Sequence, residues 1–192
     1  MPILPLVLLF LIMVVLLADI FFFISGIVSF LYGAPFVALA KDKIGRALRQ
    51  CGLSENDVFC DLGCGDGRTL LIAAEEFKVK KAVGWEIASF PFFLAKMAIG
   101  RSKARDRIEI YSRDLFLADI SKVTFIYVYL ASKMADMIAD KIAKEASDGT
   151  KVVCMAFPIN TVKYCQLESI RQEETGGMIA YLYQKKTVRK DL

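Results

Sequence analysis

The chain has 192 residues, enough for one domain with a sizeable core, and its apolar content of 56% is high for a soluble protein. Its formal net charge is a modest +4, and the basic residues form no stripe interleaved with aromatic residues, so we expect no nucleic-acid partner. The absence of histidine excludes a histidine general base, a histidine metal ligand and a Ser-His-Asp triad.

Residues 1–40 are nearly all apolar, and Asp19 is the one acidic or basic residue among them. A membrane helix needs about 20 apolar residues, whereas a cleaved signal peptide has a basic region before a shorter apolar core. The basic residues that follow place their side of the membrane in the cytoplasm: Lys41, Lys43, Arg46 and Arg49. We therefore expect a single transmembrane anchor over 1–40 and a cytoplasmic domain over 41–192. A two-helix hairpin is less favoured, because no turn signal separates two spans.

Several residues inside this anchor leave alternatives open. A carboxylate at mid-bilayer costs about 2.5–3.5 kcal/mol on insertion scales, so Asp19 has a role within the membrane or the span slides until Asp19 reaches the outer interface. Gly26, Ser29 and Gly33 share one helical face. They are either a packing surface for a partner helix or small residues that the span tolerates.

The first half of the domain alternates helix and strand. We predict a short amphipathic helix over 41–51, a buried strand over 57–62 and a helix over 68–77, followed by a strand over 80–87. The first strand and the second helix are joined by a loop with three glycines, Gly63, Gly65 and Gly67. A strand, a glycine loop and a helix in this order let backbone N–H groups approach a ligand closely.

The second half continues the alternation and ends in an antiparallel pair. We predict helices over 90–100 and 132–146 and strands over 107–112, 123–130 and 151–157. The closing pair of strands, 168–174 and 178–186, turns around Thr175-Gly176-Gly177. The alternation predicts an α/β fold with a parallel sheet covered by helices on both faces.

The domain's cysteines contain no C-x-x-C pair: Cys51, Cys60, Cys64, Cys154 and Cys165. All but Cys165 fall within a predicted element or the glycine loop. We expect free, mostly buried thiols rather than disulfides, and no metal site.

Three acidic residues mark the ligand site. Asp61, Glu86 and Asp114 each lie at or just after the carboxyl end of a predicted strand, where open α/β sheets bind ligands. The glycine spacing differs from the dinucleotide pattern G-x-G-x-x-G, and Asp61 would repel a pyrophosphate but suits a ligand with an ammonium group. Glu86, about twenty residues past the loop, can accept both ribose hydroxyls of a nucleotide.

The pattern acid-x-Gly-x-Gly-x-Gly from Asp61 resembles motif I of the class I S-adenosylmethionine-dependent methyltransferases. The resemblance implies a Rossmann-like, seven-stranded sheet and S-adenosyl-L-methionine as cofactor. It further implies that Asp61, Gly63 and Gly65 line the methionine end of the cofactor, and that Gly67 belongs to the same cofactor-binding loop. Glu86 would hold the ribose, and Asp114 with the Leu115 backbone would contact the adenine.

Longer stretches are similar to the small protein-lysine methyltransferases of archaea and their mitochondrial relatives, which include the methyltransferase of the ATP synthase c-subunit lysine. The matching stretches are D-L-G-C-G-D-G-R, V-K-K-A-V-G-W-E-I, S-R-D-L-F and G-T-K-V-V-C-M-A-F, within roughly 33–186. A weaker match, Gly33 to Leu39, departs from the family's Tyr-Val-Pro-Thr element at Phe36, Ala38 and Leu39. The resemblance implies a substrate channel near Tyr129 and Phe157.

These observations predict a membrane-anchored methyltransferase whose substrate is a lysine of a protein near the cytoplasmic membrane surface. Methyl transfer from a sulfonium depends mainly on positioning and desolvation, so it needs no dedicated base, in agreement with a chain that lacks histidine. Two alternatives stay open. One is methylation of a lipid or a lipid-soluble small molecule such as a quinone, and the other is a non-catalytic membrane scaffold with a cofactor-type fold.

Overall fold

The computed structural model describes residues 3–31, 37–130, 132–164, 166–175 and 177–186. Gly33, Phe36, Cys165 and Gly176, which were singled out in the sequence, lie outside the described residues. The four cysteines within the described ranges are free and buried, as expected: Cys51, Cys60, Cys64 and Cys154.

One mixed sheet of seven strands forms the centre of the domain, in the order β3-β2-β1-β4-β5-β7-β6. The five strands β1 to β5 run parallel, while β7 is antiparallel to both β5 and β6. The strands are β1 Val58–Leu62, β2 Lys81–Trp85, β3 Ile108–Tyr111, β4 Phe125–Val128, β5 Lys151–Met155, β6 Leu167–Glu174 and β7 Ile179–Lys185. The predicted α/β class and the closing antiparallel pair are confirmed. The strand order reverses between β1 and β4, which places the ligand-binding crevice there.

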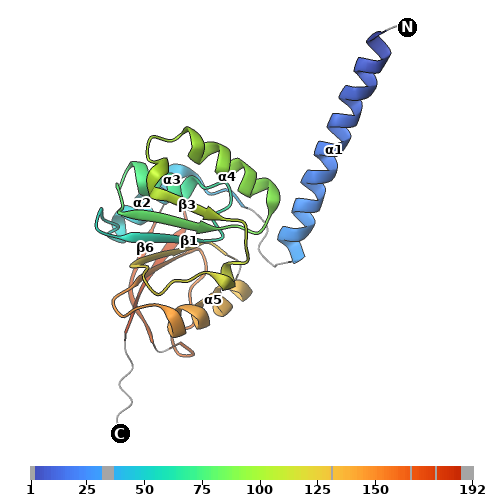
Figure 1. Ribbon diagram of the computed structural model, residues 1–192. Helices are drawn as coiled ribbons and strands as arrows, with labels where there is room; N and C mark the ends of the chain where they lie inside the picture. The colour runs from blue at the N-terminus through green and yellow to red at the C-terminus, as the bar shows by residue number, and fades with distance from the viewer. Residues whose placement is uncertain (1–2, 32–36, 131, 165, 176, 187–192) are drawn as a thin grey trace.

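Helices cover both faces of the sheet (Figure 1). The helices are α1 Ile3–Leu31, α2 Lys41–Gln50, α3 Arg68–Glu75, α4 Ser89–Arg101 and α5 Ser132–Glu145, with short 3₁₀ turns η1 Arg105–Arg107 and η2 Leu115–Leu117. Of these, α2 to α5 pack onto the domain core. One core cluster joins the sheet to α2, α3 and α4 through residues such as Leu48, Leu70 and Ala95. A second cluster joins the other face to α5 through Ile138 and Ile142. Strands covered on both faces are apolar throughout, which explains the continuous buried runs in β1, β4 and β5.

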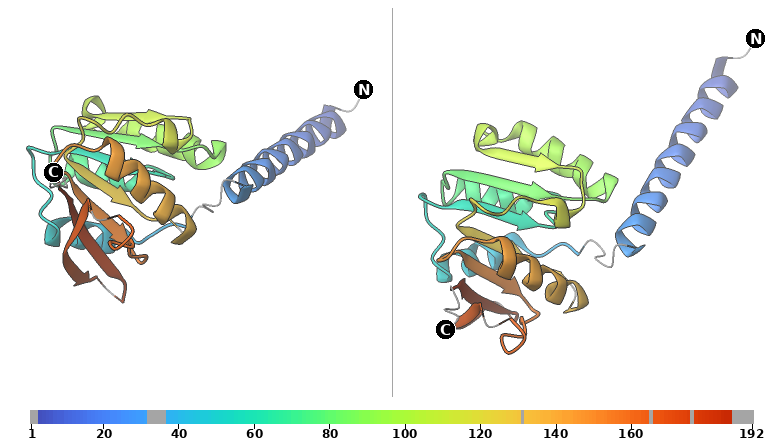
Figure 2. Two further views of the ribbon diagram at one scale, coloured as in Figure 1. Left: turned by 90° about the horizontal axis from the view of Figure 1, so that it is seen from below. Right: turned by 60° about the horizontal axis from the view of Figure 1, so that its bottom comes forward.

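The helix α1 projects away from the body of the domain (Figures 1 and 2). It runs through Asp19 as one continuous helix of 29 residues, the form that a single span takes. Its segment Ile3–Val28 is long and apolar enough to cross a membrane. Ser25 is the single buried residue among those of α1 whose exposure the structure describes. Most of the apolar side chains of α1 are exposed, and Phe21 and Phe22 contact Phe90 of α4.

Candidate active site

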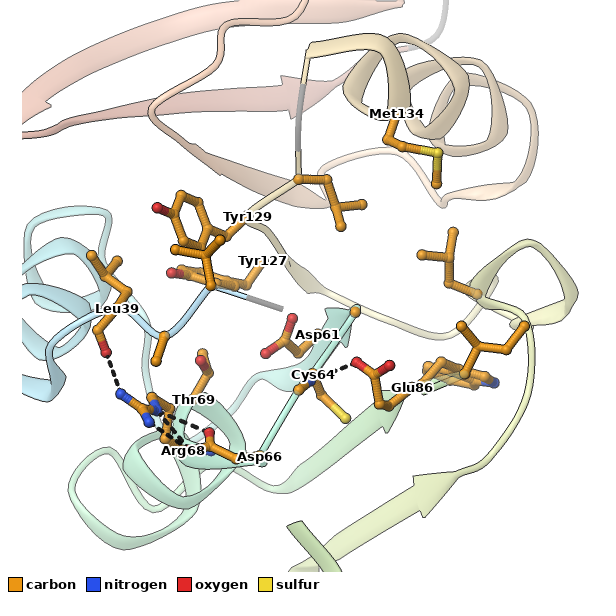
Figure 3. Close-up of a pocket in the computed structure, with 18 of the residues that line it drawn as sticks. Leu39, Asp61, Cys64, Asp66, Arg68, Thr69, Glu86, Tyr127, Tyr129 and Met134 are labelled. Atoms are coloured by element: carbon orange, nitrogen blue, oxygen red, sulfur yellow. Dashed lines mark hydrogen bonds and ion pairs between the residues drawn. The ribbon is translucent and has the colours of Figure 1, made fainter. Parts of the chain in front are cut away.

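A pocket opens at the carboxyl ends of β1, β2 and β4, beside the point where the strand order reverses. Its walls come from segments far apart in the sequence: residues 37–39, the glycine loop, the ends of β2 and β4, residues 113–116 and the start of α5. Figure 3 shows these side chains converging on one space. The location agrees with the site that the three predicted acidic residues mark.

The glycine loop folds back over the end of β2. The N–H groups of Gly63 and Cys64 both donate to the Trp85 carbonyl oxygen, at 3.0 and 2.9 Å. Gly63 has a φ of +101°, and a Cβ there would lie 3.2 Å from a Leu130 methyl group, so the position needs glycine for conformation and for space. At Gly63 and Gly65 the loop therefore presents backbone rather than a side chain to the pocket, whereas Cys64 and Asp66 line it as well.

Glu86 ties this loop to the start of α4. One carboxylate oxygen accepts the Gly65 N–H at 2.9 Å, and the other accepts the Ala88 N–H at 2.7 Å. Burial raises the pKa of Glu86 above its ordinary value, although these backbone donors lower it. The carboxylate thus sits at the pocket wall with its orientation fixed from two sides.

Asp61 and Tyr127 form a buried polar pair. They are register partners on the neighbouring strands β1 and β4, and both line the pocket (Figure 3). Burial raises the pKa of Asp61 to about 8, with the Glu86 and Asp66 charges adding to it and a Thr69 hydrogen bond opposing it. The Tyr127 hydroxyl is buried and has no hydrogen-bond partner within the described part of the chain.

A buried polar atom without a partner costs about 1–3 kcal/mol, and a buried carboxylate is costly without a nearby positive charge. A ligand that brings an ammonium group to Asp61 and an acceptor to Tyr127 relieves both penalties. The methionine part of S-adenosylmethionine carries an ammonium and a carboxylate, so the residues present fit this end of the cofactor.

Arg68 connects the N-terminal segment to the site. Its guanidinium lies 2.5 Å from Asp66 and donates to the Leu39 carbonyl oxygen at 2.8 Å. Burial would raise the pKa of Asp66, but the hydrogen bonds and charge of Arg68 lower it below its ordinary value. Val37 and Leu39, which fall within the anchor predicted from the sequence, are thereby held as part of the pocket wall.

At the other end of the pocket, Asp114 accepts the Phe116 N–H at 2.9 Å and caps the turn η2. Asp114, Leu115 and the buried Trp85 all line the pocket. The Trp85 ring stacks on Tyr111, with ring centroids 5.4 Å apart. This end offers a flat apolar surface beside a carboxylate, which is the chemistry that an adenine base requires.

The structure brings most of the predicted site residues together: Asp61, Gly63, Gly65, Glu86, Asp114, Leu115 and Tyr129 line the pocket. Gly67 and Phe157 lie outside its lining. A Cβ at Gly67 would lie 3.0 Å from that of Ala95, so Gly67 allows α3 and α4 to pack closely. Phe157 is 38% exposed beyond the end of β5. Sequence reasoning missed the lining residues Asp66, Arg68, Thr69, Tyr127 and Met134.

The family model of the ANTKMT methyltransferase domain matches residues 61–166. A protein-lysine N-methyltransferase of Saccharolobus islandicus is 35% identical over 157 residues, which cover 81% of this chain and 96% of that protein. The adenine nucleotide translocase lysine N-methyltransferase of Mus musculus is 29% identical over 53% of this chain and 44% of that protein. The ATP synthase c-subunit lysine N-methyltransferase of Xenopus laevis is 23% identical over 65% of this chain and 54% of that protein. The chain thus spans about half the length of these two animal relatives.

Among solved structures, an RNA methyltransferase from Salinibacter ruber in complex with S-adenosyl-L-homocysteine has a TM-score of 0.72 and 28% identity, covering 81% of this chain and 99% of that one. The family match spans more than half of the chain, and the Saccharolobus islandicus relative covers 81% of it. The chain therefore belongs to the ANTKMT-type family of protein-lysine methyltransferases, and S-adenosylmethionine is its cofactor.

Proposed function

We propose that this enzyme is anchored in a membrane by α1 and methylates a lysine of a protein at the cytoplasmic membrane surface. One observation carries the location: Val37 lines the pocket only six residues after Leu31, where α1 ends. An extended chain spans at most about 3.6 Å per residue, so the pocket wall lies within about 20 Å of the end of the helix. The basic residues that begin at Lys41 support a cytoplasmic domain.

The residues that line the pocket suggest how the chain holds its cofactor. Asp61 pairs with the ammonium, Glu86 accepts the ribose hydroxyls, and Asp114 accepts from the adenine amino group. When bound, S-adenosylmethionine supplies an electrophilic methyl group on a sulfonium centre. The backbone of the glycine loop leaves room for it because Gly63 and Gly65 carry no side chain.

The opposite wall suits a lysine side chain. Tyr127, Tyr129, Leu130 and Met134 make it aromatic and apolar. A lysine amine must be neutral to attack, and burial among such groups lowers the pKa of an ammonium. The pocket therefore favours loss of the proton to solvent before the amine aligns for in-line displacement, and positioning contributes most of the rate. The relatives named for lysines of adenine nucleotide translocase and of the ATP synthase c-subunit support lysine as the acceptor.

Labelling by tritiated S-adenosylmethionine tests the acceptor. Full-length enzyme is incubated with membranes, and the label is separated into protein, lipid and RNA fractions, with membranes lacking the enzyme as the control. We expect the label in protein, at lysine. Label in the lipid fraction would replace this proposal with the lipid alternative, and label in RNA would point to the activity named for the Salinibacter ruber neighbour.

The role of the anchor is tested by deleting residues 1–31, which keeps the pocket wall at 37–39 intact. Tethering raises the effective concentration of membrane substrates to about the millimolar range for short links. The truncated enzyme should therefore bind cofactor normally but methylate membrane proteins far more slowly, with a smaller loss on a soluble peptide. An equal loss on both substrates would contradict the proposed role of α1.

A further inference from the structure

The helix α4 is apolar on two sides, although the domain core covers only one. Pro91, Ala95 and Ile99 are buried against the domain. A second row, spaced by three or four residues, lies on another face of the helix: Phe90, Phe93, Leu94 and Met97. Phe93 is 51% and Met97 39% exposed, and Phe90 and Leu94 are half-buried. We call these four residues the α4 stripe.

The first turn of α4 is in contact with α1. The Phe90 N–H donates to the Ser25 hydroxyl oxygen at 2.9 Å. The Phe90 ring meets Phe21 and Phe22 edge-on, with ring centroids 6.5 and 5.1 Å apart. Figures 1 and 2 show the two helices meeting near this turn and diverging from it. The contact fixes the level of Phe90, the first residue of the α4 stripe, along α1.

This contact lies within the hydrocarbon core or at its edge, whichever part of α1 crosses the membrane. A helix needs about 20 residues to cross the hydrocarbon core, and α1 offers 29, from Ile3 to Leu31. A 20-residue window within α1 must end between residues 22 and 31, so Phe22 always lies in the core or at its edge. Phe90, in contact with Phe22, therefore lies at or inside the cytoplasmic edge of the core.

We propose that the α4 stripe is a second membrane-binding surface, inserted into the interface of the bilayer that α1 crosses. This inference rests on the proposed anchoring by α1. Aromatic and apolar side chains on one face of an interfacial helix insert about 5–10 Å into the headgroup boundary. Exposed basic residues flank the stripe or follow it, at Lys96, Arg101 and Lys103, where they suit anionic headgroups.

A lipid occupant is favoured over a protein partner because the stripe continues the uncovered apolar surface of α1. The insertion also orients the active site. Ala88, which precedes α4, donates its N–H to Glu86 in the pocket wall. This bond links α4 to the pocket, so the depth of α4 in the membrane sets the distance of the pocket from the membrane. The stripe therefore selects acceptors that lie at the membrane surface.

Tryptophan substitution in full-length enzyme reconstituted into vesicles of zwitterionic and anionic phospholipid tests this surface. The fluorescence of Phe93→Trp and of Met97→Trp reports whether the α4 stripe lies in lipid or in water. Met137→Trp is the matched control, because Met137 is 49% exposed but lies on α5, on the opposite side of the sheet. The buried Trp85 contributes equally to all variants and is subtracted using the parent protein. The quenchers are lipid-borne nitroxides near the headgroup and, separately, aqueous acrylamide.

We expect nitroxide quenching at positions 93 and 97 to be at least roughly twofold greater than at position 137, with the reverse order for acrylamide, as insertion of about 5–10 Å requires. Equal nitroxide quenching in chains that resist carbonate extraction would overturn the α4 insertion while leaving the anchor intact. Protection of position 93 from both quenchers would overturn it in favour of a protein partner. Methylation of membrane protein by the enzyme in the same vesicles tests the proposed function separately. This activity persists if the α4 stripe does not insert but the proposed function is correct.

Discussion

The protonation of Asp61 gives a sharp prediction for cofactor binding. Its pKa is raised to about 8 because the carboxyl is buried, so at pH 6 only about one molecule in a hundred carries the charge that an ammonium needs. At pH 7.5 about a quarter of the molecules carry it. If ionised Asp61 holds the ammonium of S-adenosylmethionine, the affinity should rise roughly twentyfold between pH 6.0 and 7.5.

Calorimetry in buffers with different ionisation enthalpies measures both the affinity and the protons released. The ligand's own α-amino group, with a pKa near 7.7–8.0 in model compounds, is already about a quarter to two-fifths neutral at pH 7.5, so its titration is measured on the free ligand and subtracted. We expect release of nearly one proton at pH 7. The control Asp61→Asn should bind weakly at all pH values, without proton release. A cofactor affinity that does not change with pH, together with no proton release in the parent protein, would refute the proposed role of Asp61.

Other variants test separate parts of the site. Tyr127→Phe removes the unpartnered hydroxyl, so the cofactor-free protein should be as stable as the parent or more stable in thermal unfolding. Its free energy of cofactor binding should weaken by about 0.5–1.5 kcal/mol in calorimetry. Unchanged affinity would contradict a contact between the Tyr127 hydroxyl and the cofactor. Glu86→Gln should weaken cofactor binding by about 1–3 kcal/mol in calorimetry, and equal affinity would exclude the ribose contact. Gly84→Ala places a Cβ 2.6 Å from a Leu70 methyl group and should destabilise the fold by about 1–3 kcal/mol in denaturant titration. Gly100→Ala, which places its Cβ in open space, should not destabilise the fold. Equal destabilisation by Gly84→Ala and Gly100→Ala would contradict the packing argument.

Asp61 also predicts the pH dependence of stability. In the unfolded chain the carboxyl ionises near its ordinary value of 3.8, whereas in the folded, cofactor-free protein it keeps its proton up to about 8. The folded state therefore binds more protons between these values, and Asp61 makes the free energy of unfolding fall as pH rises from about 4 to 8. Denaturant titrations of the parent and Asp61→Asn at pH 5 and 8 measure the difference, and the same slope in both proteins would contradict it.

The sequence revealed the elements whose signals are local. The glycine loop, the acids at the carboxyl ends of β1 and β2 and the alternation of strand and helix each depend on short-range patterns, and the structure confirms them. The closing strands β6 and β7 were likewise marked by the turn residues Thr175-Gly176-Gly177 between them.

Features that depend on tertiary register were missed. The run V-T-F-I-Y-V-Y-L is apolar throughout, so periodicity cannot tell that Tyr127 pairs with Asp61 while Tyr129 follows the strand end. Val37 and Leu39 continue the apolar stretch of the anchor, and hydropathy does not mark that they pass from the helix to the pocket wall. The interaction of Arg68 with the Leu39 carbonyl joins positions 29 residues apart and leaves no local signal.

Methyl transfer to a lysine of a membrane protein is the step on which the proposed function depends. Mass spectrometry of membrane proteins from cells with and without the active enzyme tests it most directly. We predict a lysine on a membrane protein that carries one, two or three methyl groups only when the active enzyme is present. Identical lysine methylation in both cells, together with loss of a methyl group from a membrane lipid, would contradict the proposal.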